Sequence, residues 1–202
     1  MNTSNLKRVF IHEIGHFIAR ELNKECFNIG CGTDSIYIQS HNISGNIDYT
    51  GGTKAIKPIE YVDNVEISNP IELMAVVLYG CTLQTLYAHG VYKFQDCFNL
   101  KDNANGKHDA MDFVALGKYF SGTQRRKIVE FIESDYLTKL NQDQSHLKKV
   151  FDLEPLKFLK SEGDLLNVNL GLLKECMIDF FNEHKTYYRY FIAKLKNIRN
   201  NG

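Results

Sequence analysis

Two histidines and a glutamate near the start of the chain have the residue types and the spacing for metal-assisted hydrolysis. His12 and His16 are four residues apart, so in an α-helix their side chains are offset by about 40° around the axis and leave one face. Two imidazoles placed this way can bind one divalent cation and supply half of a tetrahedral zinc site. Glu13 lies about 100° from His12, where its carboxylate can take a proton from a water whose pKa zinc lowers to about 7.

The neighbouring residues predict that this group lies in the middle of a helix. Thr3 or Ser4 offers an N-cap, and apolar residues recur at helical spacing from position 6 to position 22. H-E-x-x-H on a helix is the signature of the zincin class. Gly15 inside this helix costs roughly 1 kcal/mol relative to alanine. We therefore expect another backbone, or the surroundings of the metal, to pass close to Gly15.

A catalytic zinc site needs a third protein ligand in addition to a water, and several carboxylates compete for this place. Asp109 is the first choice, because it follows a loop and begins an amphipathic helix. Glu72 is the main alternative, since it lies near the start of a buried helix. Asp112, one turn after Asp109, and Asp102, in the preceding loop, also stay open.

Composition and charge limit the classes of function that this chain can have. The chain has 202 residues, 44% of them hydrophobic, and equal numbers of acidic and basic residues give a net charge of +0. This balance argues against a nucleic-acid or anionic-lipid partner. The five cysteines form no C-x-x-C pair and no signal peptide is evident, so we expect reduced thiols and a cytoplasmic protein.

The periodicity predicts a mainly α (α+β) fold. We expect a zincin-like helical domain with one small β-hairpin or sheet and a C-terminal helical bundle. Residues 1–122 would form a zinc peptidase core with the H-E-x-x-H helix and the small sheet. Residues 123–202 would form a helical region packed on the same domain.

The expected elements can be placed along the chain. A hairpin with strands at 35–39 and 45–50 ends at Gly51-Gly52, which either closes the strand or lets its backbone approach something else. Residues 70–88 form a buried core helix rather than a membrane span. The helix that contains Asp109 follows, and longer helices come at about 124–140, 143–160 and 169–198.

With these features placed in order, the chain resembles the peptidase domain of FtsH-type zinc proteases. The resemblance rests on His12-Glu13-Ile14-Gly15-His16, the hairpin ending in Gly51-Gly52, the helix with Gly80, and residues 106–109. It covers roughly residues 5–195. It implies a zinc ion bound by His12, His16 and Asp109, Glu13 as general base, and cleavage of an extended polypeptide substrate along the hairpin edge.

Two alternatives to this peptidase hypothesis stay open. One is a catalytically weak, zinc-stabilised binding or scaffold module. The other is a regulatory protease of the ImmA type, which uses a glutamate such as Glu72. FtsH proteases carry an ATPase module that this sequence does not contain, so we expect a peptidase that works alone or with a partner, with a homo-oligomer as one option.

Overall fold

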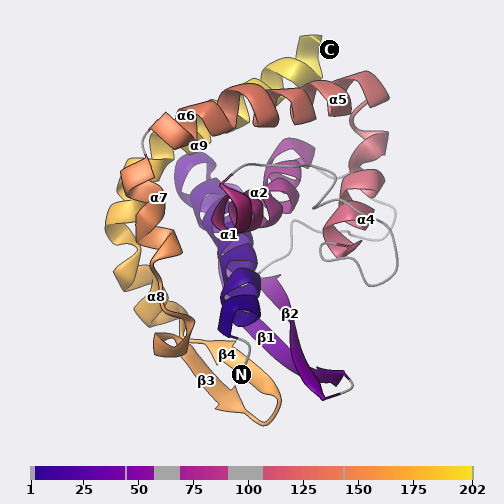
Figure 1. Cartoon of the computed structure of the whole chain (residues 1–202). Coiled ribbons are helices and arrows are strands. Elements are labelled where there is room, and N and C mark those ends of the chain that lie inside the picture. The colour runs from indigo at the N-terminus through magenta and orange to yellow at the C-terminus, as the bar shows by residue number, and fades with distance from the viewer. Residues whose placement is uncertain (1–2, 44, 57–68, 91–106, 143, 202) are drawn as a thin grey trace.

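The computed structural model describes residues 3–43, 45–56, 69–90, 107–142 and 144–201 and has the predicted mainly α (α+β) fold (Figure 1). The elements up to the middle of the chain are α1 (Thr3–Phe27), β1 (Thr33–Ile43), β2 (Asn46–Ala55), α2 (Pro70–His89) and α4 (Lys107–Ala115). The later ones are α5 (Gly122–Phe131), a π-helical turn (Ile132–Tyr136), α6 (Leu137–Gln142), α7 (Gln144–Phe151), β3 (Leu159–Glu162), β4 (Leu165–Val168), α8 (Leu170–Cys176) and α9 (Ile178–Asn201). Short 3-10 turns occupy Leu116–Lys118 and Pro155–Lys157.

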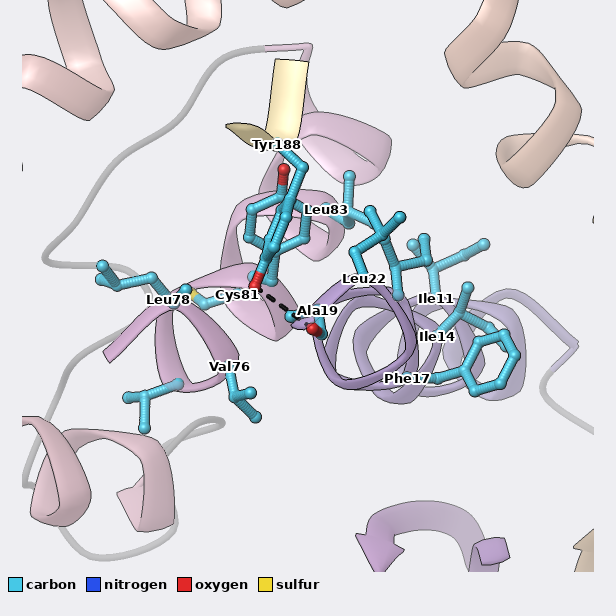
Figure 2. Close-up of a cluster of buried hydrophobic side chains, with 14 of the residues drawn as sticks. Ile11, Ile14, Phe17, Ala19, Leu22, Val76, Leu78, Cys81, Leu83 and Tyr188 are labelled. Carbon is cyan, nitrogen blue, oxygen red and sulfur yellow. Dashed lines mark hydrogen bonds between the residues drawn. The ribbon is translucent and has the colours of Figure 1, made fainter. Parts of the chain in front are cut away.

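Helices α1 and α2 pack against each other at the centre of the fold (Figure 1). Most residues of α2 are buried, because the helix is covered by α1, α4 and α9. Tyr188 of α9 reaches between the two central helices (Figure 2), where its hydroxyl donates to Asn23 Oδ1 at 2.7 Å and also lies 3.2 Å from the carbonyl oxygen of Ala19. These contacts tie the end of the chain to the helix that carries the two histidines.

The sheet has four antiparallel strands in the order β2-β1-β4-β3. The hairpin was predicted, but its strands are longer than expected, and β2 continues through Gly51-Gly52 to Ala55. The expectation that the glycine pair ends the strand is therefore wrong, and its alternative, a close backbone approach, holds. Gly52 pairs with Tyr37, whose ring fills the space where a Cβ of Gly52 would lie, 2.5 Å away.

The C-terminal half departs from the predicted helices in two places, and the first is that the helix expected at 169–198 is divided at Met177 into α8 and α9. In the second, helix α7 ends at Phe151, and residues 159–168 form β3 and β4 instead of the end of a helix and a turn. The strand β4 pairs with β1, so residues from both halves of the chain share one sheet. The other helices form an arc around the central pair (Figure 1), and their inner side chains join one hydrophobic cluster with α1 and α2.

Helix α2 is long and apolar enough to cross a membrane by length and composition, and among the described residues no other helix is. Its most apolar window is 83% buried inside the fold, so it packs here as a core helix, as predicted. Cys81 on this helix is disulfide-bonded. The expectation that all five cysteines are reduced is therefore wrong at Cys81, whereas Cys26, Cys31 and Cys176 are free.

Candidate metal centre

Helix α1 presents His12 and His16 to α2, which holds both rings in a fixed orientation. The Nδ1–H of His16 donates to the carbonyl oxygen of Val76 at 2.8 Å, and His12 Nδ1 lies 3.1 Å from Gln84 Oε1. Because Nδ1 carries a proton in this arrangement, Nε2 is the atom of each ring that can bind a metal ion once it is deprotonated. The two Nε2 atoms lie 3.0 Å apart, so both potential ligand atoms are close to one another.

Three residues of α2 at i, i+4 and i+8 make this arrangement possible. Val76 and Gln84 supply the two acceptors, and Gly80 between them leaves room for the His16 ring, which would lie 2.5 Å from a Cβ at that position. On the facing helix, a Cβ at Gly15 would lie 2.4 Å from the carbonyl oxygen of Tyr79 and 2.7 Å from the Cα of Gly80. Glycine at both positions therefore lets the two backbones touch, and the expected close approach at Gly15 is present.

Asp109 comes from the first turn of α4 and completes a group of three. Its Oδ2 lies 3.2 Å from His12 Nε2, and its Oδ1 lies 3.4 Å from His16 Nε2. The potential ligand atoms all lie within 4.8 Å of one another. Ligands about 2.0–2.1 Å from a tetrahedral zinc ion are themselves about 3.3–3.4 Å apart. The separations in this group therefore leave room for one metal ion.

Asp109 also has a carboxylate oxygen without a hydrogen-bond partner among the described residues, which a cation could bind. The Asp109 residue is 8% exposed. In the described part of the chain its buried Oδ2 has no hydrogen-bond partner with acceptable geometry, despite its 3.2 Å approach to His12. A buried carboxylate oxygen without a donor is costly. A metal ion between the three side chains would satisfy this oxygen and both imidazole lone pairs.

The charge of Asp109 favours a positive charge between the three side chains. Burial alone would lower the pKa of His16, but the charge and hydrogen bond of Asp109, with help from Glu13 and the Val76 carbonyl, raise it to about 9. Burial would raise the pKa of Asp109, yet His16 and His12 hold it well below its ordinary value. Asp109 therefore stays ionised, as a metal ligand must.

Glu13 lies beside this group under strand β2. Its side chain is 4% exposed, and its Oε2 accepts a hydrogen bond from Thr53 Oγ1 at 2.7 Å. A Cβ at Gly51 would lie 2.5 Å from Glu13 Oε1, so the glycine provides the space that this carboxylate occupies. The carboxylate is thus fixed next to the histidines without being one of the three grouped residues.

The group opens into a cleft of about 700 Å³ between α1, β2, α2 and α4. Six successive residues of β2, from Asp48 to Thr53, line it. Neighbouring side chains of a strand point to opposite faces, so one face alone would supply only every second residue. The unbroken run from Asp48 to Thr53 therefore indicates that the backbone edge of β2 also borders the cleft. β2 is an outer strand of the described sheet, so one of its edges has no strand partner among the described residues.

The other proposed third ligands lie elsewhere. The Glu72 side chain forms an ion pair with Lys196 Nζ at 3.3 Å and does not line the cleft. Asp112 lines the cleft one turn after Asp109 but does not join the described cluster, and Asp102 lies outside the described residues. Sequence reasoning did not identify a role for Gln84, although a polar residue eight positions from Val76 in an apolar helix is a usable signal.

Comparisons with known proteins add no relative. No family model matches the chain, and no curated protein or solved structure matches it either.

Proposed function

We propose that this protein is a zinc-dependent metallopeptidase that hydrolyses peptide bonds with Glu13 as the general base. The observation that carries the proposal is the convergence of His12, His16 and Asp109 from two helices. The Nδ1 atoms of both histidines have hydrogen-bond partners on α2, and the Glu13 carboxylate lies beside the group. An ordinary amphipathic helix has no need for this combination. The resemblance to FtsH-type peptidases belongs to the same proposal.

The chain's own residues have distinct roles in this reaction. When bound by His12, His16 and Asp109, zinc polarises a carbonyl and lowers the pKa of a water to about 7. Glu13 takes a proton from the attacking water, whose oxygen bonds to the carbonyl carbon of the substrate. As the carbon–nitrogen bond breaks, Glu13 passes that proton to the leaving amine. The products are a carboxyl group and an amine, and Glu13 is regenerated as a carboxylate.

The edge of β2 supports an extended polypeptide as the substrate. An extended chain can add to an exposed strand through main-chain hydrogen bonds, and the residues of β2 from Asp48 to Thr53 line the cleft beside Glu13. A peptide seated there would run past the three grouped residues, with its carbonyl groups within reach of them. Gly51 and Gly52 have no side chains that would obstruct this approach.

The test is the variant Glu13→Gln in the full chain, with His16→Ala as the matched control. We expect Glu13→Gln to bind one zinc ion but to lose cleavage of an unfolded peptide mixture, because the amide cannot accept the water's proton. His16→Ala should lose both zinc and cleavage. Retained cleavage in Glu13→Gln would disprove the role of Glu13. A wild-type protein that is fully loaded with zinc but cleaves no peptide would instead be the scaffold or binding module.

A further inference from the structure

Arg20 is the next residue on the face of α1 that carries the two histidines. It follows His16 by four residues, so its backbone lies about 6 Å further along the helix axis. Its side chain lines the same cleft as His12, Glu13 and His16. The proposed peptidase mechanism gives Arg20 no role.

The guanidinium of Arg20 has unmet bonding capacity. It has five N–H donors, and its Nε is buried with no hydrogen-bond partner. Within the described part of the chain, Arg20 makes no hydrogen bond or close ion pair. Burial lowers the pKa of Arg20, and the charges of Glu13 and Asp112 oppose this effect only in part. A partly buried cation without a partner is costly, so an anion that binds to Arg20 would stabilise it.

The surrounding carboxylates leave this anion position open. Glu13 accepts the hydrogen bond of Thr53, and Asp109 faces the two histidines. The carboxylates of Asp48 and Asp112 and the ammonium group of Lys107 also line the cleft, so its charge is mixed. An anion is therefore favoured at the Arg20 guanidinium itself rather than throughout this part of the cleft.

We propose that Arg20 binds a carboxylate of the polypeptide substrate, one or two residues from the bond that is cleaved. This inference rests on the proposed peptidase function. Arginine binds carboxylates through two parallel hydrogen bonds, and 6 Å corresponds to about two residues of an extended chain at roughly 3.3 Å per residue. The carboxylate is either the C-terminus of the substrate or an aspartate or glutamate side chain.

The experiment compares matched peptides with the zinc-loaded full chain. Cleavage sites are first mapped by mass spectrometry in a defined peptide library, and one cleaved sequence is then synthesised in four forms. Two forms end in a free carboxylate or an amide, and two carry glutamate or glutamine near the cut bond. We expect kcat/KM to be about 10- to 100-fold higher for the carboxylate member of one pair. The pair that differs identifies the source of the carboxylate.

Variants then assign this preference to Arg20. In Arg20→Gln the ratio of kcat/KM within the selective pair should fall to about 1, and Arg20→Lys should restore part of it. Arg8→Gln is the control, because Arg8 lies on the same helix and also has a buried Nε without a partner but does not line the cleft. Its ratio should equal that of the wild type.

The outcomes separate the two proposals. Cleavage with no preference in either wild-type pair would overturn the role of Arg20 and leave the peptidase function intact, and this measurement needs no variant. A preference that persists in Arg20→Gln would also overturn it. If the zinc-loaded wild type cleaves none of the peptides, the peptidase function fails and the inference about Arg20 fails with it.

Discussion

The contact between Gly15 and the backbone of α2 makes Gly15→Ala a strict test of how the two central helices hold the site. A Cβ at this position would lie 2.4 Å from the carbonyl oxygen of Tyr79, whereas ordinary carbon–oxygen contacts begin at about 3.3 Å. Since the obstacle is backbone, a change of rotamer cannot relieve it. The helices must separate by about 1 Å or stay strained.

Either response has a definite cost. Strain from overpacking costs about 1–3 kcal/mol. Separation by about 1 Å would lengthen the bond between His16 Nδ1 and the Val76 carbonyl from 2.8 Å beyond hydrogen-bond range, and a buried group left unsatisfied also costs about 1–3 kcal/mol. The higher helix propensity of alanine offsets this cost by about 1 kcal/mol. The net loss in the free energy of unfolding is therefore up to about 2 kcal/mol, and zinc affinity should fall about 10- to 100-fold because His16 loses its orienting partner.

Urea unfolding without metal and a competitive zinc titration would measure the two effects. Gly122→Ala serves as the control, because Gly122 is in a helix and a Cβ there meets nothing within 4 Å. It should leave zinc affinity unchanged. If Gly15→Ala instead gains about 1 kcal/mol and binds zinc like the wild type, the close contact of the two helices and its effect on His16 are refuted.

Three further predictions follow from named contacts. Gln84→Ala removes the partner of the His12 ring and should weaken zinc binding about 10- to 100-fold in the same titration; unchanged affinity would mean that this contact does not orient the ring. Asp109→Asn should release zinc in a metal analysis, whereas Glu72→Gln should retain it, and the reverse result would make Glu72 the third ligand. Burial, and then the charge of His146, lower the pKa of His184 to about 3, so the unfolded chain binds a proton near pH 6.5 that the folded chain rejects. The contribution of His184 to stability is therefore lost as the pH falls below 6.5, by about 2 kcal/mol at pH 5, and between pH 7 and pH 5 urea unfolding should show a change about 2 kcal/mol more destabilising in the wild type than in His184→Gln.

The long periodic elements could be predicted from the sequence, and the short strands could not. Helices α1 and α2 have apolar residues at helical spacing over many turns, and Pro70 marks the start of α2. Residues 159–168 contain only four-residue strands, which become stable when β4 pairs with β1. Such a pairing between residues more than 120 positions apart leaves no local signal. The disulfide of Cys81 was missed for the same reason, because cysteine spacing does not reveal which residues meet in space.

The position of Asp109 could be expected from the sequence only as one of several alternatives. First-turn acids are common in helices because they favour the helix dipole, and both Glu72 and Asp109 occupy such positions. What separates them is the surroundings of each carboxylate. Glu72 has a lysine partner at 3.3 Å, whereas Asp109 faces two imidazoles. These surroundings depend on tertiary packing, which periodicity does not record.

The arrangement of α2 explains why one helix can be both the core of the fold and the support of the site. Three residues four positions apart on its buried face contact the histidines in different ways. Val76 accepts a hydrogen bond through its backbone, Gly80 leaves room for the His16 ring, and Gln84 accepts through its side chain. The hydrophobic residues on its other faces fix the helix against α1 and the C-terminal arc. Because the same packing sets the depth and rotation of α2, a change in the core far from the cleft would alter both histidine rings together. Metal affinity and core stability are therefore expected to be coupled in this protein.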